Sequence, residues 1–396
     1  MADQVSEALE VPREFVKDGV QFMTRCQKPD QKEFLKISQA VGVGCHTSRE
    51  INFSLLGKKM SRAVNRSVAE ALSNGDPTAS YEAISEALAR HGDQHGELLE
   101  IEILGKSHPL EPGTFLLQDG NAIAISKYGL VQAFFVARKI LQRHLSAETI
   151  LSSDGLLAVT SVVLLMDPEH LTAANARKRL AVSAGTNSEG CLLEAIEKDR
   201  FFVDSLLTSR LHRHTKSPTL WSHRRWLIET AARRGVQHNV AKSLEKVVMV
   251  AGQRHPRNYY AWCHARWLTT NISEGQVGHE GHSLESLLPL TKRWCFRNHT
   301  DISGWSYLCF LLAKLDVAEA SSVLEEAAGL AVSLQWTNES TWVFLRTLAA
   351  SESMGGKEAK LFQGTRDALL QRTGDSEGAS SLVKAQIWFE ENRHRS

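Results

Sequence analysis

A tryptophan-containing motif that recurs along the chain constrains the fold more than any other feature of the sequence. The pattern Trp-x-His-x-Arg-Trp-Leu begins at Trp221 and again at Trp262. Weaker copies begin at Trp305 and Trp342, and a degenerate copy has Ala174 at the tryptophan position. Successive copies start 47, 41, 43 and 37 residues apart. Repeats of about 34 to 47 residues are typical of stacked helix pairs, so the sequence predicts an all-α array.

Each spacing leaves room for two helices. Apolar residues recur at helical spacing over residues 240–251, and similar segments precede Trp305 and Trp342. Pro218 and Pro256 stand where proline can open the second helix of a pair or stop the first. That second helix has large residues on two faces. We therefore expect it to be wedged between its neighbours.

The chain divides into four predicted segments. Residues 1–50 are a polar extension that we expect to lie outside the fold. Residues 51–150 are an N-terminal helical segment leading into the array, in which Asp119-Gly120 could form a small hairpin. Residues 151–350 hold the repeats, and residues 351–396 are a C-terminal helical cap.

Composition excludes several function classes. A formal net charge of +1 argues against bulk electrostatic capture of nucleic acid or of an anionic membrane. The apolar stretches are far shorter than the ~20 residues of a spanning helix, so stable membrane insertion is not expected. Six cysteines without a C-x-x-C pair favour a reducing compartment, the cytoplasm. The run from His279 to His282 lacks the spacing of H-E-x-x-H, and we expect a loop there and no metal site.

The run Pro-x-Asn-Tyr-x-Ala-Trp-x-His-x-x-Trp-Leu, from Pro256 to Leu268, resembles the repeat of protein prenyltransferase α subunits. Residues 216–227 match the same repeat without its Asn-Tyr, and residues 164–178 with 216–218 resemble the repeat-containing branch of that family. The resemblance implies a right-handed solenoid of antiparallel helix pairs. It also implies a β subunit partner, which holds zinc and the isoprenoid pocket, whereas this chain binds no cofactor.

The resemblance further implies a function and a set of site residues. The chain would be the non-zinc α subunit of a heterodimer, inactive alone, that transfers geranylgeranyl from its diphosphate to the cysteine thiolate of an acceptor protein. Lys216, five residues before Trp221, would be the catalytic contact to the diphosphate. Tyr259 and Tyr260 would face the cleft shared with the β subunit. His223 and His264 are assigned to the same cleft, with structural hydrogen bonding as the alternative.

The remaining motif residues are assigned to the repeat core. Tryptophan buries a large area and suits the wedge between helices. Arg225 and Arg266 are either partner contacts or members of ion pairs between repeats. The core set comprises Trp221, Arg225, Trp226, Trp262, Arg266, Trp267, Trp305 and Trp342.

The N-terminus carries a second resemblance. Residues 12–19 and 25–34 are similar to the cytosolic helix of the SecE-type γ subunit of the protein translocon. That family continues into a membrane span, whereas this sequence turns to Cys45-His46-Thr47. A fused or misjoined gene is the simplest explanation, and residues 1–44 would then take no part in prenyl transfer.

Two other functions stay open at this point. One is a tetratricopeptide-like helical scaffold that binds peptides and has no catalytic role. The other is a translocon-associated fusion.

Overall fold

The computed structural model describes residues 76–89, 97–105, 107–186, 188–273, 284–373 and 377–393. They belong to one compact unit, residues 69–396. The predicted extension over residues 1–50, with its SecE-like segment, and the loop expected at 279–282 lie outside the described residues. The described part of the chain is mostly helical, as the sequence predicts.

A small mixed sheet lies near the start of the unit, between α4 (Pro77–Ala89) and α5 (Lys127–Leu145). Strands β1 (Glu100–Leu104), β2 (Leu116–Asp119) and β3 (Ala122–Ser126) follow the order β1-β3-β2. The predicted hairpin is confirmed, because β2 and β3 are antiparallel with Asp119 opposite Ala122. Gly120 turns the chain at a φ of 54°, a conformation that glycine adopts readily.

Strand β1 pairs with β3 in parallel, with Ile101 opposite Ile123. The prediction of a helical segment over residues 51–150 is therefore wrong over the strands of residues 100–126. Ile101 and Ile103, like Ile123 and Ile125, alternate with period two, the spacing that puts side chains on one face of a strand. This alternation outweighs any helical tendency there.

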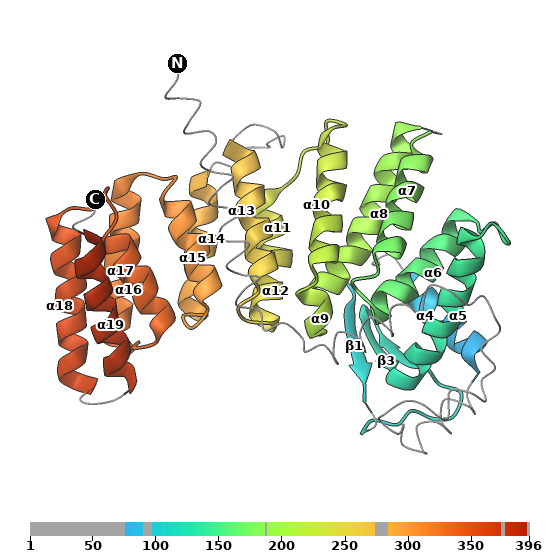
Figure 1. The fold of residues 1–396 in the computed structure, drawn as a ribbon, viewed down its shortest axis with the longest axis horizontal. Coiled ribbons are helices and arrows are strands. Elements are labelled where there is room, and N and C mark those ends of the chain that lie inside the picture. The colour runs from blue at the N-terminus through green and yellow to red at the C-terminus, as the bar shows by residue number, and fades with distance from the viewer. Residues whose placement is uncertain are drawn as a thin grey trace, which may run out of the picture. The chain divides into compact units, whose positions relative to one another are not determined.

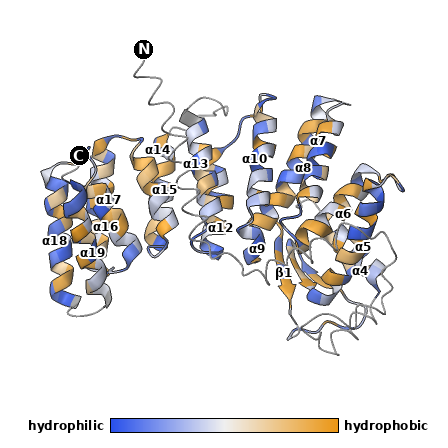
Figure 2. Ribbon diagram, viewed as in Figure 1, coloured by the Kyte–Doolittle hydropathy of each residue, from blue (hydrophilic) through white to orange (hydrophobic). Residues whose placement is uncertain are grey.

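The rest of the unit consists of helices that follow one another in chain order (Figure 1). They are α6 (Ser153–Met166), α7 (Leu171–Ala184), α8 (Glu189–Thr208), α9 (His212–Thr215), α10 (Pro218–Ala232), α11 (Val240–Ser243), the π-helix η2 (Leu244–Val248), α12 (Met249–Arg254), α13 (Tyr259–Ser273), α14 (Leu284–Arg297), α15 (Ile302–Leu312), α16 (Val317–Ser333), α17 (Glu339–Ala349), α18 (Gly356–Thr373) and α19 (Glu377–Arg393). Helix α6 is mostly hydrophobic along its length, and most of it is buried (Figure 2).

The motif-bearing helices pack against one another in succession. Helix α7 contacts α10, α10 contacts α13, α13 contacts α15, and α15 contacts α17. Helix α17 contacts α19 in the same way, so the packing pattern continues beyond residue 350. Within the described ranges, no helix is both long and apolar enough to cross a membrane.

A capping residue fixes where each motif-bearing helix begins. Ser217, Asp301 and Asn338 each accept a hydrogen bond from the backbone amide three residues later, at 3.1 to 3.2 Å. Asn258 does the same toward Ala261, at 3.2 Å. Such side-chain acceptors satisfy backbone N–H groups that have no partner in the first turn. The motif tryptophan always stands four residues after the cap, so the caps set its phase around the helix.

Two further features position the candidate site. The π-helix η2 inserts a wide turn between α11 and α12 and buries Leu244, Val247 and Val248. Arg254, at the end of α12, contacts the Thr208 carbonyl of α8 and pairs with Glu100 of β1, with 2.5 Å from Nη2 to Oε1. The helical array is thereby connected to the sheet.

Candidate functional site

Three of the four motif tryptophans make an equivalent hydrogen bond. The indole Nε1 of Trp221, Trp305 and Trp342 donates to the carbonyl six residues earlier, at Thr215, His299 and Trp336, over 2.8 to 2.9 Å. Each indole therefore closes the turn that leads into its own helix. These three tryptophans are buried with the core, as the sequence predicts.

Trp262 departs from this pattern at the turn where Lys216 lies. The carbonyl six residues before Trp262 belongs to Pro256, and the ammonium Nζ of Lys216 donates to it at 3.0 Å. Trp262 Nε1 is buried and finds no partner among the described residues. An unpaired buried donor costs about 1–3 kcal/mol, so this repeat differs energetically from the other three. Lys216 thus ties the second repeat to the third.

Basic side chains lie close together at the turn that Lys216 contacts. The rings of His212 and His255 meet edge to face with centroids 5.2 Å apart. Burial lowers the pKa of His255, and His212, Lys216 and Arg254 lower it further by charge repulsion. Because a lowered pKa favours the neutral imidazole, the positive charge here comes from Lys216 and Arg254, and it attracts an anion.

The two tyrosines predicted to face a shared cleft lie on the surface next to this turn. Tyr259 is 67% exposed and Tyr260 is 39% exposed, and their rings meet edge to face at 5.6 Å. A hydrogen bond with Cys263 raises the pKa of Tyr259. Both rings are accessible to a partner or ligand.

The two histidines assigned to the same cleft are instead buried. His223 is 1% exposed and His264 is 5% exposed. The assignment to the cleft is wrong for both, and the alternative, structural hydrogen bonding, describes them. His223 Nε2 lies 2.7 Å from Asp199 Oδ2, and it must donate because a carboxylate accepts. His264 Nε2 must accept, because Arg224 Nη1 donates to it at 2.6 Å.

These contacts belong to a buried polar network centred on two aspartates of α8. Asp199 accepts from Arg177 Nε at 2.6 Å as well as from His223. Burial alone would raise the pKa of Asp199, but Arg177 and His223 outweigh it and hold that pKa far below the usual range. Asp204 accepts from Arg224 Nε at 2.6 Å. Helix α8 is thus bonded to α7 and to α10 through buried charges.

Arg224, not its neighbour Arg225, occupies the buried position. Arg224 is 1% exposed, whereas the side chain of Arg225 is 53% exposed and pairs with Glu229 at 2.7 Å. The sequence assigned Arg225 to the repeat core, and the structure gives this role to Arg224. Consecutive residues of a helix point about 100° apart, so only one of the two arginines can point inward.

Arg225 takes part in a second regular pattern, which crosses the repeat boundaries. Its guanidinium lies over the ring of Trp267 in the next motif helix at 4.9 Å. In the same way Lys178 lies over Trp226, Arg266 over Phe310 and Arg346 over Trp388, at 4.6 to 5.7 Å. Each cation–π contact of this kind is worth about 0.5–1 kcal/mol at exposed sites. Trp388 of α19 thereby marks a sixth copy of the repeat, which the sequence analysis missed.

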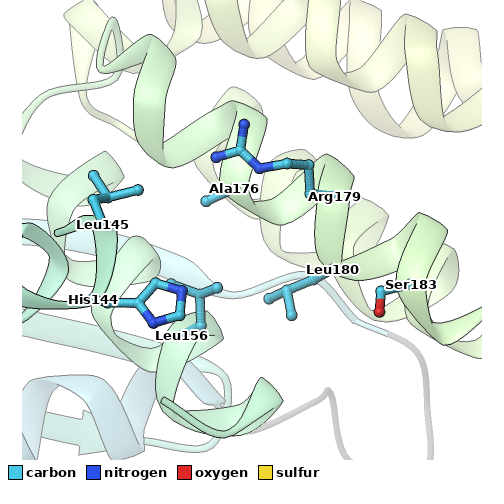
Figure 3. A pocket seen from close by; sticks show the side chains of 7 residues that line it. All are labelled: His144, Leu145, Leu156, Ala176, Arg179, Leu180 and Ser183. Atoms are coloured by element: carbon cyan, nitrogen blue, oxygen red, sulfur yellow. The ribbon is translucent and has the colours of Figure 1, made fainter. Parts of the chain in front are cut away.

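Lys216 lines neither of the two hollows described next. A cavity of about 190 Å³ between α5, α6 and α7 is lined mainly by Leu145, Leu156 and Leu180, with His144 and Arg179 at its side (Figure 3). A larger groove of about 900 Å³ lies between the start of β1, α8 and the segment from 236 to 254. The groove carries acidic and basic side chains in nearly equal number, so it has no strong preference for one sign of charge. In the described ranges, no cluster of three potential metal ligands is present.

Comparison with known proteins shows which residues match each of the two families that the sequence resembles. Residues 205–231 match the protein prenyltransferase alpha subunit repeat, residues 220–334 match the ECM9 middle domain, and residues 13–46 match the SecE/Sec61-gamma subunits of protein translocation complex. Both resemblances stated from the sequence are therefore confirmed.

Individual relatives cover only parts of the chain. Protein prenyltransferase alpha subunit repeat-containing protein 1 of Danio rerio is 29% identical over 183 residues, which are 42% of this chain and 39% of that protein. The probable protein transport protein Sec61 subunit gamma of Neurospora crassa is 70% identical over 44 residues, 11% of this chain and 63% of that protein. Protein transport protein SSS1 of Saccharomyces cerevisiae is 52% identical over 42 residues, 11% of this chain and 52% of that protein. The chain therefore spans less than two thirds of the length of each of these relatives.

Proposed function

We propose that this chain is the α subunit of a heterodimeric protein prenyltransferase that transfers geranylgeranyl to a protein cysteine. The observation that carries the proposal is the position of Lys216, a half-buried cation at an accessible turn within an α-subunit-type repeat. Arg254 adds a second positive charge close by, and the rings of His212 and His255 offer N–H donors. This is the environment that a departing diphosphate requires.

The proposed chemistry divides between two subunits. The β subunit supplies zinc, which holds the acceptor cysteine as a thiolate. The thiolate sulfur attacks the allylic carbon of the prenyl diphosphate, the carbon–oxygen bond breaks, and the diphosphate leaves with the bonding electrons. Lys216 stabilises the negative charge that grows on the leaving oxygens. This chain contributes no metal and is inactive without its partner.

The proposed architecture is a right-handed solenoid of antiparallel helix pairs in a cytoplasmic protein. The successive contacts from α7 through α19 and the recurring cation–π pairs support it. In that arrangement the exposed rings of Tyr259 and Tyr260, beside Lys216, belong to the cleft that the two subunits share.

Coexpression with candidate prenyltransferase β subunits tests the proposal. We expect one β subunit to purify with this chain as a stable pair. The pair should transfer geranylgeranyl from its diphosphate to a cysteine-bearing acceptor, faster than it transfers farnesyl. Failure to pair with any candidate β subunit would contradict the proposal.

A second candidate function rests on the N-terminal match of residues 13–46 to SecE/Sec61-gamma subunits. In this alternative the chain is a fusion that is associated with a translocon. Fractionation of the native protein separates the two candidates, because a translocon-associated protein sediments with membranes and stays there in high salt.

A further inference from the structure

We propose that the Pro256 carbonyl serves two donors in turn, Lys216 in the free chain and Trp262 when Lys216 binds an anion. Trp262 is then a positioning residue for Lys216. The inference rests on the proposed function, because it takes Lys216 as the group that contacts a condensed phosphate.

The comparison among repeats carries the inference. Trp221, Trp305 and Trp342 all donate to the carbonyl six residues earlier. Trp262 follows its cap, Asn258, by the same four residues as the other three follow theirs. Its indole is therefore in phase with the Pro256 carbonyl. Two features distinguish this turn. Lys216 already donates to that carbonyl, and Arg257, the next residue, has a left-handed φ of 59°.

The indole of Trp262 is held where the exchange needs it. Its ring meets Trp294 at 4.8 Å between centroids and Tyr307 at 5.3 Å. An added Cβ at Gly252 would lie 3.4 Å from Nε1, and one at Gly304 would lie 3.3 Å from Cζ2. The ring is thus closely packed on several sides, so the exchange requires the turn at Pro256, and not the indole, to move.

The exchange leaves no buried group worse paired than before. When Lys216 leaves, the Pro256 carbonyl accepts a hydrogen bond from the indole instead. The buried N–H of Trp262, which is unpaired in the free chain, then has a partner. Lys216 can therefore turn toward an anion without abandoning a carbonyl. A lysine at a turn without such a second donor would have to leave its acceptor unpaired.

The charges around the turn favour an anionic ligand. His212 comes from α9, Arg254 from the end of α12, and His255 from the turn before α13. Two acidic groups lie nearby. Glu100 of β1 already pairs with Arg254, and Asp301 Oδ2 accepts a hydrogen bond from the backbone N–H of Arg257 at 2.7 Å. A condensed phosphate carries several negative charges and would compete with a neutral carbonyl for the Lys216 ammonium.

Indole N–H resonances of the full chain, recorded by nitrogen-15 NMR, test the inference. The chain has nine tryptophans. The Trp262 resonance is assigned by Trp262→Phe or, if that variant does not fold, by contacts with the Trp294 ring. We expect Lys216→Met to move the Trp262 resonance downfield, to where the bonded indole of Trp305 appears. Lys216→Arg keeps a donor at the carbonyl and should leave the resonance near its wild-type position.

Inorganic pyrophosphate supplies the second half of the test. Added to the wild-type chain, it should move the Trp262 resonance in the same direction as Lys216→Met does, while the Trp305 resonance stays in place. Added to Lys216→Met, it should move neither. An unmoved Trp262 resonance in Lys216→Met overturns the exchange, and an unmoved resonance with pyrophosphate overturns its control by the anion.

This result is separable from the proposed function. The NMR measurement needs no partner and no prenyl transfer. A chain that shows the exchange but forms no active pair with any β subunit would contradict the proposed function alone. An active pair whose free α chain shows no exchange would contradict this inference alone.

Discussion

Arg224 of one repeat donates a hydrogen bond from Nη1 to Nε2 of His264 in the next, over 2.6 Å. The same guanidinium bonds Asp204 of α8 and Ser243 of α11. One buried side chain therefore joins α8, α10, α11 and α13. His264 can accept this bond only while its Nε2 carries no proton.

Replacing Arg224 should destabilise the chain strongly. Arg224→Leu leaves Asp204 buried without its cation, and breaking one partner of a buried pair costs about 3–5 kcal/mol. We expect the free energy of unfolding in urea to fall by that amount. Arg225→Leu is the matched control, because its exposed pair with Glu229 and its contact with Trp267 together contribute about 1 kcal/mol. Equal losses in the two variants would contradict the assignment of Arg224 to the core.

Acid should begin to destabilise the chain at a pH well above the ordinary pKa of carboxyl groups. Burial lowers the pKa of His214 from 6.5 to about 4, and burial with repulsion from Arg224 lowers the pKa of His264. Both histidines are neutral in the folded chain but become protonated in the unfolded chain below its ordinary pKa. Their contribution to stability is therefore present at neutral pH and is lost on acidification, for His214 as the pH falls from 6.5 toward 4.

Urea unfolding at pH 7 and at pH 5 measures this loss. His214 alone accounts for about 2 kcal/mol of it by proton linkage. His214→Gln keeps an N–H donor for the Leu164 and Leu165 carbonyls, which Nε2 of the histidine contacts at 3.1 and 2.7 Å. The variant should therefore lose about 2 kcal/mol less than the wild type between the two pH values. An identical loss in both proteins would show that His214 does not titrate as its burial implies.

Two glycine-to-alanine substitutions should have opposite effects. A Cβ on Gly304 would lie 2.3 Å from Cζ3 of Trp294, whereas a Cβ on Gly329 would have no neighbour within 4 Å. We expect Gly304→Ala to cost about 1–3 kcal/mol through overpacking. Gly329→Ala, inside α16, should gain about 0.5–1 kcal/mol because glycine is a poor helix former. Thermal unfolding of the pair measures both, and a gain in Gly304→Ala would contradict the packing described for the Trp262 and Trp294 rings.

Lys216→Ala should separate catalysis from assembly in the proposed heterodimer. Loss of a charge aimed at the developing negative charge lowers turnover by about 10²–10³-fold. Copurification with the β subunit should be unchanged, because Lys216 lies at a turn. Lys360→Ala, on an exposed face of α18, is the control and should leave turnover intact. Unchanged turnover in Lys216→Ala would contradict the assignment of Lys216 to the diphosphate.

The sequence predicts the repeats because the same large residues recur in them and have the same packing role in each. Trp221, Trp262, Trp305 and Trp342 are buried at equivalent places, as their recurrence indicates. The caps four residues ahead of them were also readable, since Ser, Asn and Asp are common at helix starts. The sixth copy escaped detection because its tryptophan, Trp388, stands five residues later in the motif, where Trp226 and Trp267 stand in theirs.

The choice between Arg224 and Arg225 could not be made from the sequence. The two side chains are identical and adjacent, and what separates them is a buried partner in another helix. Asp204 lies 20 residues before Arg224, and no motif surrounds it. The cleft assignment of His223 and His264 failed for the same reason, because Asp199 and Arg224 supply the buried partners that make them structural. Long-range pairing of polar groups leaves no periodic signal.

The wide turn at Leu244–Val248 sets the orientation of the side chains of α12, the helix that continues directly from it. A π turn holds one residue more than an α turn, so it rotates the downstream residues by about 100° relative to a regular helix. Arg254 follows this turn and contacts Thr208 and Glu100 in the rotated orientation. Deleting a single residue from this turn would rotate Arg254 by about 100° around the helix axis. The deletion would thereby remove the contacts that connect the helices to the small sheet.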